Sequence, residues 1–107
     1  MLVFPLKKEW YEKIKSGEKT VEYREVKPYW TKRLQNELGG TSFEPVHYMS
    51  DKRFDGLRCV LRLGYTKKYL KACINAIEVV NGKNTDLAID KPVYSIHLYH
   101  IREGINL

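Results

Sequence analysis

The segment from Ser16 to Arg24 carries the residues whose types and spacing best suit chemistry. Its sequence, SGEKTVEYR, places Lys19 just after a glycine turn, at the start of a predicted strand. Side chains alternate along a strand, so Thr20, Glu22 and Arg24 line one face as a hydroxyl, a carboxylate and a guanidinium. Such a row can hold a base edge or a phosphate, with Arg24 making a bidentate contact. The alternative is a solvent-facing strand whose charges neutralise one another.

Glu78 is a second candidate, because it is a carboxylate among apolar residues in a strand predicted over 70–81. Counting by two, it shares a face with the apolar residues Ala72, Ile74, Ala76 and Val80. We expect this face to point inward, where a carboxylate is costly unless it is paired or protonated. Lys19 or Arg24 would be natural partners, and a carboxylate paired with a lysine can act as a general base. A structural ion pair, or the opposite in/out phase of the strand, is the alternative.

The stretch from residue 52 to 71 concentrates the positive charge of the chain. It holds seven Lys or Arg residues against one carboxylate, which equals the net charge of +6 for all 107 residues. A concentrated basic surface attracts phosphates, and tyrosines beside it can stack on bases. A solvated face without a ligand is the alternative. The members of the predicted ligand surface are Arg58, Arg62, Tyr65, Lys67 and Lys68.

The sequence lacks the residue patterns of several functional classes. The three histidines show no metal-ligand spacing, and there is no phosphate-binding glycine loop, dinucleotide fingerprint or Ser-His-Asp signature, so we expect no metal or cofactor. No stretch approaches the ~20 apolar residues of a membrane helix, and the first apolar run ends at Lys7, so we expect no signal peptide and no membrane partner. Cys59 and Cys73 are too few for a disulfide scaffold; they indicate free thiols in a reducing cytosol and a cytoplasmic protein.

The elements that must position these residues follow from hydrophobic periodicity and turn residues. Helices are predicted over 8–16, where Gly17 ends the helix, and over 29–38. The expected strands cover residues 2–6, 19–24, 57–65, 70–81 and 93–101, with an irregular segment at 41–55 and a connection at 84–91. Five strands and two early helices predict one α+β domain over 1–107, with a curved antiparallel or mixed sheet rolled into a partial barrel.

The segment from Gly17 to Arg24 resembles the hallmark of the ASCH family, which belongs to the PUA-like superfamily. That hallmark is a helix ending in a Gly-x-Lys-Thr turn, followed by a strand with Glu-x-Arg, and here it is written GEKTVEYR. Residues 9–14 look like the helix that enters the turn, and 54–65 and 72–80 look like two barrel strands. The resemblance implies a small PUA-like β-barrel of five to six strands flanked by two N-terminal helices. It also implies a cleft suited to RNA or a nucleotide-like small molecule.

The resemblance also implies roles for particular residues. Small stand-alone ASCH proteins include amidohydrolases acting on acetylated cytidine, and nuclease activity is also reported in the family. The amidohydrolases use a lysine, a threonine three residues after it and a glutamate on a later strand. The lysine corresponds to Lys19 and the glutamate to Glu78. Glu22 stands at the threonine position, whereas Thr20 comes one residue after the lysine. This departure puts a second carboxylate beside the lysine.

Two functions from different classes follow. The first is binding of RNA or a nucleotide in a basic cleft beside the Gly-x-Lys-Thr motif. The alternative is a small metal-independent hydrolase, an amidohydrolase on a modified nucleoside or a ribonuclease, that uses Lys19 with Glu22 and Glu78 while Arg24 stabilises developing charge. A third is a plain interaction domain whose basic stretch is merely solvated. The sequence leaves the oligomeric state open, and also whether residues 41–55 close over the cleft.

Overall fold

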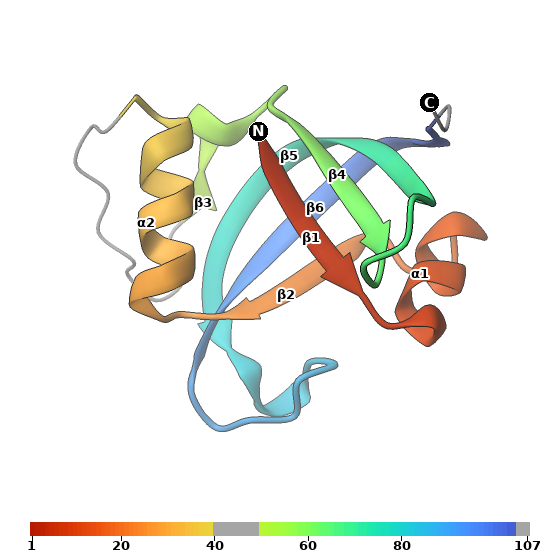
Figure 1. Ribbon diagram of the computed structural model, residues 1–107. Coiled ribbons are helices and arrows are strands. Elements are labelled where there is room, and N and C mark those ends of the chain that lie inside the picture. Colours follow the sequence, from red (N-terminus) through yellow and green to blue (C-terminus); the bar gives the residue numbers. More distant parts are fainter. Residues whose placement is uncertain (40–49, 105–107) are drawn as a thin grey trace.

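The computed structural model describes residues 1–39 and 50–104, and at its centre a mixed sheet curls into a half-barrel (Figure 1). The strands are β1 (Leu2–Leu6), β2 (Val21–Glu25), β3 (Ser50–Asp51), β4 (Arg58–Leu63), β5 (Tyr69–Asn81) and β6 (Pro92–Glu103). Their order is β1–β4–β5–β6–β2, and β3 pairs with β5 beside this path. β1 runs parallel to β4, and the other neighbours are antiparallel.

Two helices cover opposite ends of the curled sheet (Figure 1). They are α1 (Lys8–Lys15), which buries Tyr11 and Ile14, and α2 (Pro28–Glu37), which buries Leu34. Short 3-10 turns, η1 (Lys52–Phe54) and η2 (Gly82–Asn84), precede β4 and follow β5. In the described residues, neither helix has the length and apolar character needed to cross a membrane.

The predicted α+β class, with two helices and a curled, barrel-like sheet, is confirmed. The five predicted strands and both predicted helices are present, with ends that differ from the prediction by two residues at most. The segment predicted as irregular at 41–55 lies mostly outside the described residues, and its described end forms β3 and η1. The possible closure of residues 41–55 over a cleft therefore also concerns residues that lie mostly outside the described part of the chain.

Two bulges bend the long strands β5 and β6. Ile74 pairs with Leu98 and Ala76 with His97, so β5 has an extra residue at Asn75. Nearer the end of β6, the register gains an extra residue between Tyr99 and Arg102, where His100 has a φ of 57°. A bulge bends its strand and increases its twist, which is how two long antiparallel strands curl into a half-barrel.

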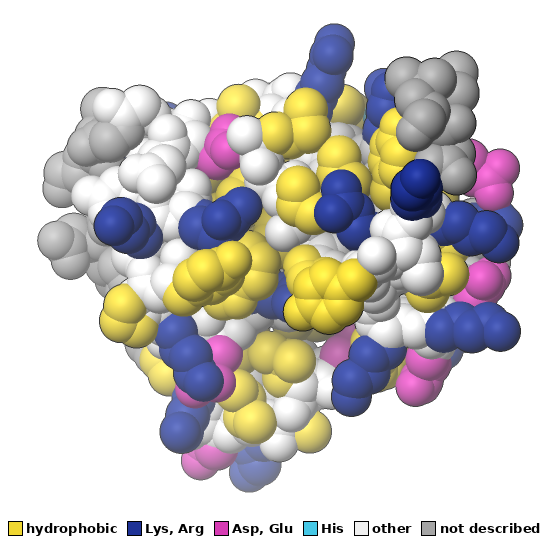
Figure 2. All heavy atoms as spheres, in the orientation of Figure 1, with side chains coloured by type: hydrophobic (Ala, Val, Ile, Leu, Met, Phe, Trp, Pro, Cys, Tyr) yellow, Lys and Arg dark blue, Asp and Glu magenta, His cyan; other side chains and the backbone are white. Residues whose placement is uncertain are grey.

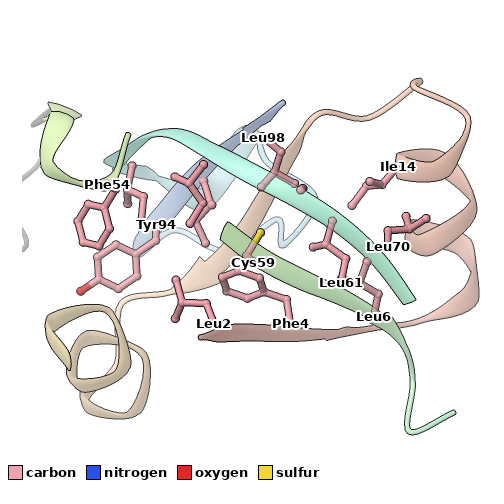
Figure 3. Close-up of a cluster of buried hydrophobic side chains, with 14 of the residues drawn as sticks. Leu2, Phe4, Leu6, Ile14, Phe54, Cys59, Leu61, Leu70, Tyr94 and Leu98 are labelled. Atoms are coloured by element: carbon pink, nitrogen blue, oxygen red, sulfur yellow. The ribbon is translucent and has the colours of Figure 1, made fainter. Parts of the chain in front are cut away.

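The core fills the inside of this curl (Figure 3). It is built from alternate residues of the strands, since side chains on one face of a strand recur every second residue. Ile14 of α1 points into it beside Leu70 and Leu98, and Phe54 and Tyr94 pack at the opposite end. The buried strand residues include Leu2, Phe4, Cys59, Leu61, Ala72, Ile74, Ile77, Val79 and Ile96.

The bulge at Asn75 makes the predicted phase of β5 wrong. The buried residues of β5 are Leu70, Ala72 and Ile74 before the bulge and Ile77 and Val79 after it. Glu78 therefore projects from the outer face, and its side chain is 39% exposed. The prediction that Glu78 points inward assumed strict alternation along the strand. One inserted residue moves every later residue of the strand to the opposite face of the sheet.

Candidate functional site

The turn after α1 carries Lys19 to a free strand edge. Gly17 has a φ of 84°, in the left-handed region that favours glycine, and its N–H donates to the carbonyl of Ile14 at 3.1 Å. The N–H of Lys19 then donates to the carbonyl of Lys13 at 3.0 Å, which folds the chain back against the helix. β2 follows as an edge strand beside β6, as β1 is beside β4. We call the gap between the edge strands β1 and β2 the seam.

Lys19 and Glu22 bond the backbone of β2 along the seam. The ammonium of Lys19 donates to the carbonyl of Val21, and the N–H of Tyr23 donates to Oε1 of Glu22 at 2.9 Å. The same ammonium donates to the carboxylate of Asp86, in the connection between η2 and β6, and lies 3.9 Å from Oε1 of Glu22. Edge strands need their unpaired groups covered. These charges therefore support the fold as well as lining the seam.

Two aromatic rings enclose the Lys19 ammonium. Its Nζ lies 5.5 Å from the ring centre of Trp10 and 4.8 Å from that of Tyr23, within cation–π range. Burial raises the pKa of Tyr23, the nearby carboxylate of Asp86 adds to this, and a hydrogen bond from Ser95 offsets part of it. The phenol therefore stays protonated at neutral pH and can donate a hydrogen bond.

Arg24 bridges the seam. Glu22 and Arg24 share one face of β2, as predicted, and that face points inward. Nη2 of Arg24 donates to the carbonyl of Pro5 in β1 at 2.8 Å and lies 3.3 Å from Oε2 of Glu22. Its guanidinium lies 5.5 Å from the ring of Phe4 and 5.0 Å from that of Trp30. A side chain thus joins the two edge strands where the described sheet has no ladder.

A cleft follows the seam and appears as a hollow near the middle of the face in Figure 2. It consists of a main hollow of about 630 Å³ and an adjoining one of about 340 Å³, which share Trp10, Tyr23 and Asp86. Other lining residues of the main hollow include Pro5, Glu22, Arg24 and Trp30, and those of the smaller one include Lys13, Glu18, Lys19 and Thr20. The two linings together carry five cations and five carboxylates, so the charge of the cleft is balanced where a basic cleft was expected.

Glu78 lies on the outer face of the sheet, apart from this cleft. Its Oε1 is 3.6 Å from Nε2 of His97, and the same nitrogen is 3.3 Å from Oγ of Ser95. A hydrolytic Ser-His-acid triad needs the acid and the serine on different nitrogens of the imidazole. This group lacks that arrangement, and Ser95 is only 5% exposed.

The other predicted ligand residues do not line the cleft either. Arg58 and Arg62 project from the outer face of β4 and are exposed. Tyr65, Lys67 and Lys68 are exposed in the turn between β4 and β5. Of the ten predicted site residues, the cleft lining brings together four: Lys19, Thr20, Glu22 and Arg24.

Sequence reasoning missed four residues of the seam. They are Pro5, Trp10, Trp30 and Asp86. Trp30 reads as a core residue of its helix, and Trp10 likewise fits the apolar stripe of α1. Asp86 stands 67 residues from Lys19 in the chain, and no local pattern signals a pair at that separation. The backbone carbonyl of Pro5 carries no sequence signal at all.

Within residues 1–39 and 50–104, no group of three or more His, Cys, Asp or Glu side chains could hold a metal ion. No family model matches the chain, and neither a curated protein nor a solved structure matches it.

Proposed function

We propose that this protein is a small ASCH-type domain whose seam cleft binds a nucleotide-like unit, either a free nucleotide or one residue of RNA. One observation carries the proposal. Glu22, only 6% exposed, stands between the cations Lys19 and Arg24 in a cleft walled by Trp10 and Trp30. A shielded carboxylate with flanking donors and ring platforms is the equipment that recognises a nucleobase edge.

The groups of the cleft suit the parts of a nucleotide. A carboxylate oxygen of Glu22 accepts hydrogen bonds from an amino or ring N–H, while Arg24 and Lys19 donate to a carbonyl or a phosphate. The main hollow of about 630 Å³ falls within the range of roughly 300–1,000 Å³ that is typical of small-molecule sites. A double helix does not fit a hollow of this size, so the expected ligand is one unpaired nucleotide.

The fold supports the family assignment within this proposal. The resemblance implies a PUA-like barrel flanked by two N-terminal helices, and α1, α2 and the curled sheet agree with that outline. The hallmark residues Lys19, Glu22 and Arg24 also meet in one place. We extend the proposal to a cytoplasmic location, because both cysteines are free and burial raises the pKa of the Cys59 thiol to about 12, which makes it an unreactive core residue.

Hydrolysis is the second candidate, and one contact favours it. Nζ of Lys19 lies 3.9 Å from Oε1 of Glu22, so a shielded carboxylate sits beside a cation and could activate a water molecule for attack on a bound nucleoside. Glu78 would take no part in this version, because it faces His97 on the outer face. The ammonium of Lys19 donates to Asp86 and to Val21, so its role would be electrostatic rather than nucleophilic.

The two candidates are tested with Glu22→Gln and its matched control Glu78→Gln. Wild type and both variants are incubated with ribonucleoside monophosphates and with acetylated or methylated nucleosides, and binding is measured by calorimetry and products by mass spectrometry. We expect Glu22→Gln to weaken binding roughly tenfold, which is about 1.4 kcal/mol, because one charged hydrogen bond to the base is lost. Glu78→Gln should bind like wild type.

The possible outcomes distinguish the hydrolase from the binding domain. A product formed by wild type but not by Glu22→Gln would establish the hydrolase. Binding without product, weakened only in Glu22→Gln, would support the binding domain. The proposal fails if no compound of the panel binds, or if both variants bind as wild type does. Circular dichroism of each variant shows whether the fold is intact.

A further inference from the structure

The outer face of β4, β5 and β6 carries four exposed cations that the cleft does not use. They are Arg58 and Arg62 of β4, Lys71 of β5 and Arg102 of β6, and we call them the basic outer face. Cross-strand register places them together: Arg58 stands opposite Cys73, Lys71 stands between Val60 and Arg102, and Arg62 stands opposite Tyr69. Neighbouring strands lie roughly 4.8 Å apart, so these positions form one continuous surface.

Nothing in the described structure neutralises these charges. No carboxylate of the described residues lies within ion-pair distance of any of the four. Lys71 and Arg102 also stand directly opposite each other on adjacent strands, and like charges in that position destabilise a sheet. An anionic partner would relieve this repulsion, which no carboxylate of the described residues does.

A bulge holds Arg102 in this surface. The extra residue in β6 keeps both Tyr99 and Arg102 on the outer face, although three positions separate them. His100 adopts a φ of 57° at the bulge, and its carbonyl accepts a hydrogen bond from Nη1 of Arg102 at 3.1 Å. The guanidinium is therefore oriented before any ligand arrives, which lowers the entropy lost on binding.

One exposed tyrosine shares the face of the cations, and a second lies in the turn that follows β4. Tyr99 pairs with Cys73 on the same face and is 43% exposed, and Tyr65, in the turn between β4 and β5, is 97% exposed. An exposed ring near cations offers a platform on which a base can stack. Arg58 and Arg62 are four residues apart on one strand, roughly 13 Å, a length over which a nucleic-acid strand presents several phosphates.

We propose that the basic outer face is a docking surface for single-stranded RNA, separate from the seam cleft. Guanidinium groups match phosphates in a bidentate way, and exposed rings match unstacked bases, whereas an acidic peptide would need only the charges. A sheet face of this kind stacks splayed bases, which a double helix keeps paired. The inference goes beyond the proposed nucleotide site, because it requires no ligand in the cleft.

The test compares two triple variants of equal net charge. Arg62→Gln/Lys71→Gln/Arg102→Gln removes the surface, and Lys8→Gln/Lys32→Gln/Lys83→Gln removes exposed lysines elsewhere. Binding of a labelled oligouridylate of about 12 nucleotides is followed by fluorescence anisotropy at two salt concentrations. The first variant should lose roughly tenfold or more in affinity, with a salt slope smaller by about 2, since each single-strand phosphate contributes roughly 0.7. The control should stay within about twofold of wild type.

Further variants and a competition experiment can contradict the proposal. Tyr99→Ala should lose about fivefold in affinity, while Tyr29→Ala, an exposed tyrosine of α2, should lose none. Equal losses in both triple variants, or no binding by wild type, would overturn the proposal. Polyglutamate that displaces the RNA at equal charge would overturn the assignment to RNA. The outer-face variant should bind nucleoside monophosphates as wild type does, because none of its three residues lines the cleft, so failure at the cleft and failure at the outer face give different results.

Discussion

The seam and the basic outer face both gather charged residues, but they surround them differently. In the seam, Lys19, Glu22 and Arg24 bond to one another, to backbone carbonyls and amides, and to aromatic rings. On the outer face, Lys71 and Arg102 have no ion-pair partner in the described residues and repel each other across two strands. The same residue types thus stabilise the fold in one region and strain it slightly in the other.

Because their surroundings differ, the two regions should recognise different kinds of ligand. A charge that is already bonded gains from a ligand only when the ligand replaces one of its partners with matching geometry, so the seam should be selective. A charge without a partner gains from any correctly signed ligand, so the outer face should tolerate many sequences and respond to salt. Net charge differs in the same sense, because the cleft lining is balanced whereas the basic outer face carries four cations with no carboxylate of the described residues in ion-pair distance.

Arg24→Met should have the largest effect on stability. It leaves the carboxylate of Glu22 buried with fewer partners, and we expect the free energy of unfolding to fall by about 3 kcal/mol, measured by urea unfolding. Arg62→Met, the control from the outer face, should leave it unchanged. The double variant Glu22→Gln/Arg24→Met should recover part of the loss, since no charge is then stranded. Equal losses in Arg24→Met and Arg62→Met would erase the distinction between the regions.

Tyr94→Phe should have the next largest effect. The hydroxyl of Tyr94 bonds the side chain of Thr31, which ties α2 to the core beside the seam, and its removal should lower the free energy of unfolding by about 1 kcal/mol. Burial raises the pKa of Tyr94 above its usual value of about 10. Its contribution is therefore complete below pH ~10 and is lost as the pH rises through the raised pKa. Urea unfolding at neutral and alkaline pH should show a shallower alkaline decline in the variant; an equal decline would contradict this.

Asp86→Asn should change binding more than stability. It frees the ammonium of Lys19, so we expect nucleoside monophosphates to bind about threefold more tightly in calorimetry. Asp90→Asn is the control, because Asp90 lies in the same connection but bonds the amide of Asn81 at 2.8 Å. Weaker binding in Asp86→Asn would mean that this carboxylate contacts the ligand itself.

The smallest effect is expected at an exposed ion pair between α1 and β6. A hydrogen bond from Lys15 lowers the pKa of Glu103, so its contribution is present above the usual carboxylate pKa and lost as the pH falls through the lowered value. Glu103→Gln should lower the free energy of unfolding at neutral pH only slightly, because the pair is exposed, and should make the acid limb slightly shallower, while the exposed control Asp55→Asn leaves the value at neutral pH unchanged. A clear loss at neutral pH would show that exposed pairs matter here as much as the seam does.

Local patterns in the sequence predicted the helices and strands, and they also predicted the arrangement of side chains on β2, one strand of the site. The apolar stripe and glycine turn located α1 and Gly17, and alternation placed Glu22 with Arg24 on one face of β2. These features depend on residues close in the chain, which a single sequence displays.

Features set by distant residues could not be predicted in the same way. The bulge at Asn75 is defined by pairing with β6, and Asn75 itself has no composition signal for it, so the face of Glu78 was predicted wrongly. The partners of Lys19 and Arg24, Asp86 and Pro5, come from other elements and become neighbours only when the sheet curls. The basic stretch was found as a cluster, but its separation from the motif depends on the order of the strands.

The bridge between β1 and β2 has a consequence for native-state hydrogen exchange. One guanidinium joins these strands, whereas β5 and β6 share a ladder from Leu70 to Asn81. The amide of Tyr23, held by the carboxylate of Glu22, should therefore exchange with solvent deuterium through brief local opening. Amides in the middle of β5 should exchange only when the whole domain unfolds. The half-barrel should therefore open locally at the seam, where the proposed ligand would enter, while the rest of the sheet stays protected from exchange.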